Sequence, residues 1–163
     1  MESPLRQINL VPPADGRQSD TALAVARGTA RLLHQFGFSC VAELALPSGR
    51  RADIVALNGA GEFWIVEIKS SVADFRADQK WVDYRAHCDR LFFATTVEVP
   101  CEIFPTDTGL IVADAFGARM LCEAPQHRLH ASTRKSMMLA FARCAALRLQ
   151  ALADPAGPFA AEF

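Results

Sequence analysis

The chain is poor in the features that mark secreted, zinc-binding or membrane-spanning proteins. Its five cysteines are scattered and without a CxxC spacing, so we expect reduced thiols in a cytosol, with no zinc site or disulfide framework. The apolar runs are all much shorter than the roughly 20 residues of a membrane helix, so no membrane partner is expected. The N-terminus also lacks the basic region and apolar stretch of a secretory signal.

An excess of positive charge is missing as well. The sequence has 17 Lys and Arg against 18 Asp and Glu, a formal net charge of −1. Indiscriminate DNA binding usually comes with a strongly basic domain. Any nucleic-acid contact must therefore use a local basic patch, the groove of a homodimer, or a helper protein. No internal repeat, glycine-rich phosphate loop or Ser-His-Asp spacing is present.

What is present suits one globular domain of 163 residues, 51% of them apolar and 21% charged. We expect an extended arm over residues 1–17, the domain over 18–153 and a flexible tail over 154–163. Hydrophobic periodicity and turn residues predict nine elements in chain order. These are a helix (20–36), strands (38–46, 51–57 and 63–69), a helix (72–87), a strand (89–95), two short strands (109–113 and 118–123) and a last helix (132–152). This order predicts an α/β (α+β) fold with a mixed central sheet.

Acidic residues interrupt two apolar strands that are expected to form a hairpin. The turn signal Asn58-Gly-Ala-Gly61 separates the strand carrying Asp53 from the strand carrying Glu67 and Lys69. If residues 57 and 63 close the hairpin, Asp53 lies across from Glu67. Alternation along the strand puts Glu67 and Lys69 on one face. Two carboxylates and an ammonium then converge on one patch of the sheet.

Such a patch has two interpretations of about equal weight. Two carboxylates about 4 Å apart repel by roughly 4 kcal/mol at an effective dielectric near 20, so they need a shared proton, a cationic side chain or a metal. Asp53, Glu67 and the strand carbonyl of Ile68 supply oxygen ligands that suit Mg²⁺ or Mn²⁺. A water activated there beside Lys69 is suited to phosphodiester cleavage. The alternative is a salt-bridged strand pair on a solvated face.

Glu43 enters the same sheet on the first strand. An acidic residue in the stretch Val-Ala-Glu-Leu-Ala-Leu is costly without a partner. Glu43 is expected either to be a third carboxylate at the metal or to pair with Arg50 or Arg51. The first interpretation is slightly favoured.

The two later helices carry the other candidate residues. In the helix over 72–87, an apolar stripe comprises Phe75, Val82 and Ala86, while Gln79, Lys80 and Tyr84 begin near the Glu67 strand end and are directed toward a phosphate. The last helix is expected to turn inward Met138, Phe141, Ala145, Leu149 and Leu152. A basic cluster before and at its start makes an anionic partner there attractive, since cations oppose a helix N-terminus; its members are Arg128, His130, Arg134 and Lys135.

The element order, with Asp53 on the second strand and Glu67-x-Lys69 on the third, resembles the PD-(D/E)XK nuclease superfamily and its restriction-endonuclease-like core. The resemblance implies that Asp53 and Glu67 hold Mg²⁺ or Mn²⁺ while Lys69 positions the attacking water. Ala52 stands where the superfamily name has Pro. Glu43 is the best match to an upstream Glu found in many relatives. A Gln-x-x-x-Tyr motif is matched imperfectly, with four residues between Gln79 and Tyr84.

Longer motifs resemble the MmcB-like DNA-repair proteins of bacteria over about residues 22–152. They are Gly49-Arg-Arg-Ala-Asp53, Val66-Glu-Ile-Lys-Ser-Ser71, Asp74-Phe-Arg-Ala-Asp-Gln-Lys-Trp81, Cys88-Asp-Arg and Gly109-Leu-Ile-Val-Ala-Asp114. This resemblance implies a protein of the bacterial cytosol, associated with the nucleoid and linked to DNA damage or mutagenic repair.

Together these observations lead to two functional hypotheses. The first is a metal-dependent DNA endonuclease or related phosphodiesterase, with catalytic or metal-binding roles for Asp53, Glu67, Lys69, Glu43 and the Ile68 carbonyl, and DNA contacts from Gln79, Lys80, Arg51 and Arg76. The second is a non-catalytic repair adaptor that binds DNA or delivers another repair protein. A homodimer is one expected assembly under either hypothesis.

Overall fold

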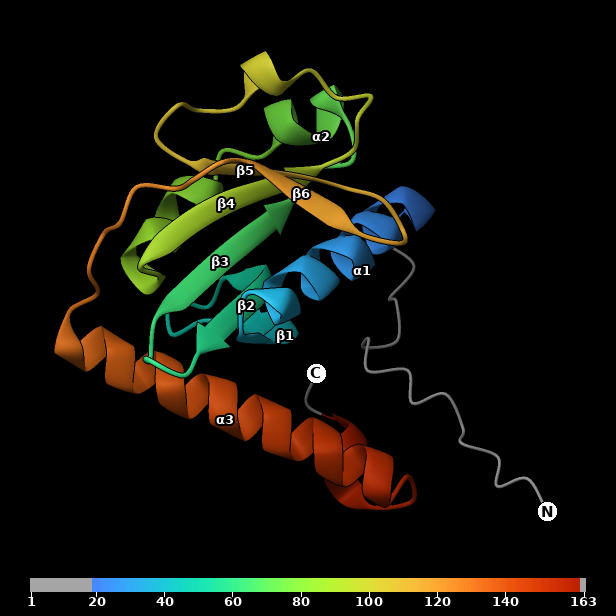
Figure 1. The fold of residues 1–163 in the computed structure, drawn as a ribbon. Helices are drawn as coiled ribbons and strands as arrows, with labels where there is room; N and C mark the ends of the chain where they lie inside the picture. Colours follow the sequence, from blue (N-terminus) through green and yellow to red (C-terminus); the bar gives the residue numbers. More distant parts are fainter. Residues whose placement is uncertain (1–18, 162–163) are drawn as a thin grey trace.

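A six-stranded mixed sheet runs through the computed structural model, which describes residues 19–161 (Figure 1). The strands lie in chain order: β1 (Phe38–Ala45), β2 (Arg51–Asn58), β3 (Phe63–Ile68), β4 (Arg90–Thr95), β5 (Gly109–Ala113) and β6 (Ala118–Cys122). The β3–β4 and β4–β5 pairs are parallel, and the other neighbours are antiparallel. The predicted mixed α/β fold is confirmed, whereas the expected arm over 1–17 lies outside the described residues.

Three α-helices and three short 3₁₀ segments complete the described chain. The helices are α1 (Asp20–Gln35), α2 (Val72–Ala77) and α3 (Ala131–Ala153), and the 3₁₀ segments are η1 (Trp81–His87), η2 (Cys101–Ile103) and η3 (Pro158–Ala161). Ser19 caps α1 as expected, because its hydroxyl accepts the Ala22 N–H at 3.1 Å. The segment η3 lies within the tail that was expected over 154–163.

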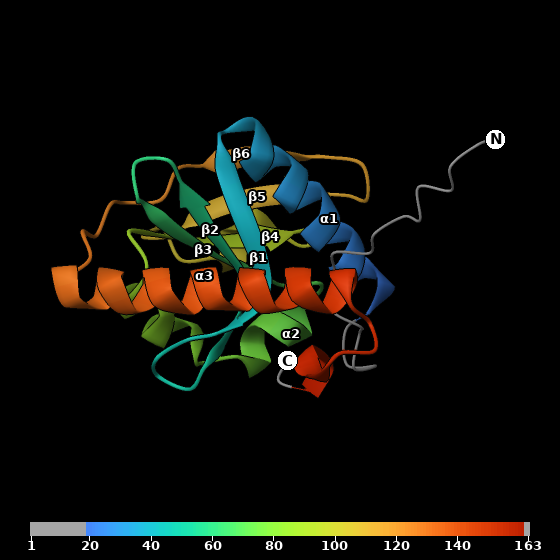
Figure 2. The ribbon, with the colours of Figure 1, turned by 90° about the horizontal axis from the view of Figure 1, so that it is seen from below.

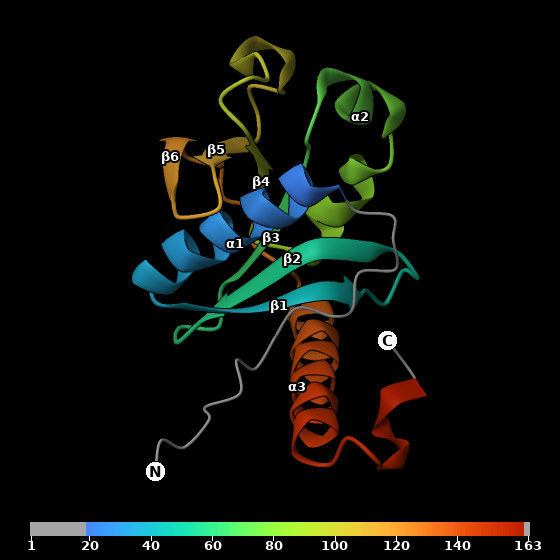
Figure 3. The same ribbon diagram turned by 90° about the vertical axis from the view of Figure 1, so that its right-hand side faces the viewer.

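The sheet is covered on both faces. One core contains Val25 and Leu33 of α1 against Ile54, Val66 and other side chains of the sheet. The core on the opposite face brings η1 and α3 onto the sheet, with side chains that include Val55, Ile65, Tyr84, Met137 and Phe141. In Figure 3, β1 and β2 accordingly lie between α1 and α3. The site residues of β2 and β3 therefore stand in a well-packed middle layer.

The continuous helix expected over residues 72–87 is wrong. The structure breaks it into α2 and η1, and the chain at Asp78 is extended, with φ −99° and ψ 107°. The Asp78 carboxylate accepts the Lys80 N–H at 2.8 Å and a hydrogen bond from Lys69 at 2.6 Å. These contacts hold the break in place. Because the break rotates the following residues, Val82 is 53% exposed and does not share a buried stripe with Phe75.

The last helix has the predicted length, but a different face is buried. Met137 and Phe141 face the core, whereas four of the five side chains expected inward are exposed: Met138, Ala145, Leu149 and Leu152. Apolar side chains occur both on the buried side of the helix and on its exposed side, so its periodicity does not select the buried face. Polar contacts select it instead, because Arg134 binds Asp89 and Arg148 donates to the Ala42 carbonyl of β1.

Asp89 fixes the start of α3 to the sheet. Its carboxylate, 2% exposed, accepts the backbone N–H groups of Phe63 at 2.8 Å and Leu129 at 3.1 Å. It also accepts two hydrogen bonds from the Arg134 guanidinium, at 2.7 and 2.9 Å. Arg134 was expected to meet an anionic partner as part of a basic cluster. The anion that it meets is an internal carboxylate.

Gly28 allows α1 to lie against the turn between β5 and β6. A Cβ atom at this position would be 2.1 Å from the Asp114 carbonyl oxygen and 2.4 Å from that of Gly117. Only glycine fits such a close approach of helix and turn backbone. Arg31 strengthens the contact by donating to the Phe116 carbonyl at 2.9 Å.

Replacing Asp89 by Ala is expected to lower the free energy of unfolding by about 3 kcal/mol, because two buried N–H groups and a guanidinium lose their acceptor. Urea unfolding measures the change. Asp83→Ala serves as the control, since Asp83 pairs with Arg50 at the surface, where such pairs contribute about 0–1 kcal/mol. Equal effects of the two substitutions would contradict the role assigned to Asp89.

Candidate functional site

The β2–β3 hairpin places Asp53 beside Glu67. The Asn58 side-chain oxygen accepts the N–H groups of Ala60 and Glu62 at 3.0 Å each, which shapes the turn. Leu57 pairs with Phe63 as predicted, and the register continues to Ile54 opposite Val66. One further step puts Asp53 across from Glu67. Both residues belong to the sheet face that carries Val55 and Ile65.

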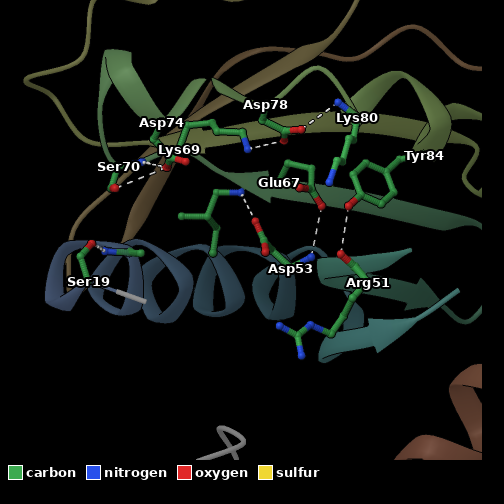
Figure 4. Close-up of a pocket in the computed structure, with 12 residues that line it drawn as sticks. Ser19, Arg51, Asp53, Glu67, Lys69, Ser70, Asp74, Asp78, Lys80 and Tyr84 are labelled. Atoms are coloured by element: carbon green, nitrogen blue, oxygen red, sulfur yellow. Dashed lines mark hydrogen bonds and ion pairs between the residues drawn. The ribbon is translucent and has the colours of Figure 1, made fainter. Parts of the chain in front are cut away.

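Beyond the Ile54–Val66 pair, the carboxylates of Asp53 and Glu67 accept the backbone N–H groups that strand carbonyls accept elsewhere in the sheet. The Asp53 N–H donates to Glu67 Oε1 at 3.2 Å, and the Ile68 N–H donates to Asp53 Oδ2 at 2.7 Å (Figure 4). Each carboxylate thus accepts one backbone donor from the neighbouring strand. The remaining lone pairs of both carboxylates are available for a ligand.

The two carboxylates line a cavity of about 450 Å³. Its wall is formed by the start of α1, the ends of β2 and β3, and the segment from α2 to η1. The lining residues are Ser19, Ala22, Arg51, Asp53, Glu67, Ile68, Lys69, Ser70, Asp74, Asp78, Lys80 and Tyr84. Six of the nine residues proposed for the site from the sequence are therefore brought together at one cavity.

Burial makes the charged forms of both carboxylates unfavourable. Burial is the main cause that raises the pKa of Asp53 to about 6; the Ile68 N–H opposes the shift and the charge of Glu43 adds to it. Burial and the charge of Asp53 raise the pKa of Glu67 well above its usual range. No Lys, Arg or His side chain among residues 19–161 forms an ion pair with either carboxylate. Within this part of the chain, neither carboxylate is therefore neutralised by an ion pair.

Lys69 lies at the same cavity but is bound to a different acid. Its Nζ atom donates to Asp78 Oδ2 at 2.6 Å, and its side chain is 6% exposed. Burial alone would lower the pKa of Lys69, but the hydrogen bond and charge of Asp78 outweigh it and raise the pKa. The same contact, together with the Lys80 N–H, holds the pKa of Asp78 below its usual value despite burial. The Lys69 amine is therefore a fixed positive charge.

Glu43 lies across from Asp53 on β1 and is paired with Arg51. Its Oε2 atom is 2.6 Å from Arg51 Nε, which matches the less favoured of the two expectations. The backbone at Glu43 is left-handed, with φ 53°, and the ladder omits this position between the pairs Ala42–Ile54 and Leu44–Ala52. A left-handed backbone at a residue with a side chain costs about 1–3 kcal/mol. This strain lies directly beside Asp53.

The structure separates the residues that were proposed to contact DNA. Arg51 and Lys80 line the cavity, and the Lys80 side chain extends toward Glu67 and Tyr84 (Figure 4). Arg76 and Gln79 are exposed outside the lining, and Gln79 Nε2 donates to the Arg76 carbonyl at 3.3 Å. The Tyr84 hydroxyl donates to the Arg51 carbonyl at 2.9 Å, so it connects η1 to β2.

Asp78 and Asp74 are site residues that the sequence patterns did not reveal. Both fall in the stretch read as one regular helix, where a spacing of four residues suggests a solvated face. In the structure Asp74 accepts the Ser70 N–H at 3.0 Å and Asp78 accepts Lys69. No glycine or proline lies at the break at Asp78, so the sequence contains no helix-breaking residue there that would have predicted it.

A comparison with protein-family models identifies a family for this chain. A family model described as "DNA repair protein MmcB-like" matches residues 9–156. A solved structure, of a protein of unknown function from Silicibacter pomeroyi, is similar with a TM-score of 0.82 and 44% sequence identity, over 86% of this chain and 96% of that chain. None of the curated proteins gives a significant match.

Asp53→Asn is expected to stabilise the protein above pH 6 in the presence of EDTA. The folded-state pKa of Asp53, about 6, exceeds its usual value of 3.8, so the folded state holds this proton more tightly. Stability is therefore lost as the pH rises from the usual pKa of an aspartate through 6, and the neutral amide avoids a loss of about 3 kcal/mol at pH 8. The amide oxygen still accepts the Ile68 N–H. Glu67→Gln should act in the same direction.

Thermal unfolding at pH 5 and pH 8 measures this effect, with a gain of several degrees at pH 8 and a smaller one at pH 5. Glu102→Gln is the control, because Glu102 is exposed on η2 and should show no such dependence. An Asp53→Asn variant that is less stable than the parent at pH 8 would contradict the unfavourable desolvation assigned to the Asp53 carboxylate.

Proposed function

The chain belongs to the MmcB-like family of DNA repair proteins, and on this premise we propose that it is a metal-dependent DNA endonuclease or related phosphodiesterase. One observation carries the proposal: buried Glu67 and half-buried Asp53 lie together at an open cavity without a cationic partner from the described residues. A protein that needs only stability would neutralise such a pair or replace it. The strand positions of both acids and of Lys69 also suit the PD-(D/E)XK superfamily.

The donor set at the cavity fits Mg²⁺ or Mn²⁺. Hard divalent cations bind carboxylate and carbonyl oxygens and keep several waters. Asp53 and Glu67 supply the carboxylates. The N–H of Ile68 points to Asp53, and because N–H and C=O of one strand residue point the same way, the Ile68 carbonyl faces that side too. Bound there, a divalent cation supplies a Lewis acid that stabilises negative charge on a phosphoryl group.

The third carboxylate proposed from the sequence is less suited to this set. Within the described part of the chain, no group of three or more His, Cys, Asp or Glu side chains is arranged to hold a metal ion. Glu43 is engaged by Arg51. We therefore assign the metal to Asp53, Glu67 and the Ile68 carbonyl, with Glu43 acting on Asp53 through its charge.

Lys69 is suited to stabilising charge and unsuited to removing a proton. Asp78 keeps its amine protonated at the cavity wall, so it acts as a hydrogen-bond donor to a phosphoryl oxygen or to the attacking water. Hydrolysis adds water across a P–O bond, and the departing oxygen takes up a proton. Arg51 and Lys80, at the rim of the same cavity, are the proposed contacts to phosphates, with Arg76 and Gln79 further out.

A second candidate function is a non-catalytic repair adaptor that binds DNA or another repair protein. Residues 19–161 hold no cluster of three or more His, Cys, Asp or Glu arranged for a metal ion, and the net charge of the chain is −1; both facts weaken the case for independent cleavage and favour the adaptor. The adaptor hypothesis predicts DNA binding that requires neither a metal nor Glu67. This difference separates the two candidates.

With Mg²⁺ or Mn²⁺, the purified chain is expected to cleave at least one of single-stranded, duplex, flapped or damaged DNA. Asp53→Asn and Glu67→Gln should lower the rate by at least about 100-fold while the fold remains intact. Gel assays with end-labelled DNA measure the rates, and Glu102→Gln is the matched control with an unchanged rate. Absence of cleavage on all four substrates with both metals would refute the nuclease.

Binding of Mn²⁺ is expected to raise the melting temperature, because a ligand that binds only the folded state stabilises it. The rise should shrink as the pH falls below 6, where Asp53 is protonated. It should vanish in Glu67→Gln. A melting temperature that does not respond to Mn²⁺ at pH 8 would remove the metal from the proposal, whatever the protein does with DNA.

A further inference from the structure

The outer side of α3 is an apolar surface that no described element covers. Four large side chains on it are well exposed: Leu149 by 67%, Leu139 by 55%, Met138 by 40% and Leu152 by 39%. The helix packs on the rest of the molecule through its other side, mainly against β1, η1 and η3. Seen from below, α3 crosses the molecule in front of the sheet along its whole length (Figure 2).

The exposed residues follow the period of a coiled-coil seam. Met138, Ala142, Ala145, Leu149 and Leu152 succeed one another at spacings of 4, 3, 4 and 3 residues, and all are exposed. A second row, one position further along the helix, adds Leu139, Ala146 and Ala153. A stripe of this width and period is typical of a helix that packs against another helix. We name these eight residues the α3 stripe.

The α3 stripe is complementary to itself when two helices run antiparallel. Small side chains occupy its middle, where Ala142 of one copy meets Ala145 of the other and the backbones can approach closely. Large side chains occupy both ends, so Met138 of one copy meets Leu149 of the other. The helix is about 34 Å long at 1.5 Å per residue, which allows contact over the whole stripe.

Charge favours the same antiparallel arrangement. Lys135 is exposed near the start of α3, and Asp154 is exposed just after its end. An antiparallel pair brings these opposite charges together at both ends. It also places the positive end of each helix dipole beside the negative end of the other. Among the exposed residues between 138 and 153, Arg143 is the one charged side chain, and it lies on the row with Gln150 at the edge of the α3 stripe.

By length and composition alone, α3 would also be apolar enough to cross a membrane, and 11% of its apolar window is buried. Its contacts within the fold oppose that role. Arg134 is bound to buried Asp89, Arg148 donates to β1 carbonyls, and Met137 and Phe141 belong to the core. Leaving the sheet would break all of these contacts.

We propose that the α3 stripe is the interface of a two-fold symmetric homodimer, in which the α3 helices of two copies pack antiparallel. An isologous interface of this kind uses the same surface on both subunits. The cavity at Asp53 and Glu67 takes no lining residue from α3, so the α3 stripe and the cavity share no residue. The dimer is therefore independent of the proposed nuclease activity and is tested without it.

Size-exclusion chromatography with light scattering on the full chain is expected to give twice the 17.8 kDa mass of one copy. Leu149→Glu should shift the mass to that of one copy and raise the dissociation constant at least about 100-fold, because each substitution acts twice in a symmetric interface. Gln150→Glu, which adds the same charge at the neighbouring exposed position off the α3 stripe, should remain dimeric. Circular dichroism melts confirm that both variants are folded.

Three outcomes would overturn the proposal. A parent chain that is monomeric at all concentrations up to about 100 µM, a concentration that detects weak dimers, would do so. A dimer that Leu149→Glu leaves intact would show that a different surface is used. A monomeric chain that sediments with phosphatidylcholine or phosphatidylglycerol vesicles, and loses this binding in Leu149→Glu, would assign the α3 stripe to a membrane surface.

Discussion

Desolvation of two adjacent carboxylates, which disfavours their charged forms, is the constraint around which this molecule is organised. Asp53 and Glu67 are held together by the β2–β3 register, and each accepts a backbone N–H of the opposite strand. The sheet that carries this pair is covered on both faces. The raised pKa values of both acids and their cost to stability are two expressions of this desolvation, and the proposed attraction for a divalent cation would be a third.

Lys69 lies near the two carboxylates but does not form an ion pair with either of them. A lysine next to two carboxylates would ordinarily neutralise one of them, and the cavity would then be less suited to the proposed cation. Asp78 prevents this by binding the Lys69 amine, and it is in position because the chain breaks between α2 and η1. The irregular segment after β3 thus separates the positive charge from the acidic pair while leaving both at one cavity.

Sequence patterns predicted the parts that depend on local periodicity. The hairpin register followed from the Asn58–Gly61 turn, and all six strands and the two long helices were found within one or two residues. The patterns failed where distant contacts decide. The break at Asp78 depends on Lys69, the buried face of α3 depends on Asp89 and β1, and the partner of Glu43 depends on the conformation of β1. None of these contacts leaves a periodic trace in the sequence.

Gly28 has a mechanical consequence for the cavity. The α1 helix touches the β5–β6 turn at Gly28, and its first turn supplies Ser19 and Ala22 to the cavity wall. A bulkier residue at this contact would push α1 away from the β5–β6 turn. Since a helix moves as a stiff rod, the displacement would reach the cavity wall about two turns away. The absence of a side chain at Gly28 therefore helps to set the width of a cavity whose acids lie far from it.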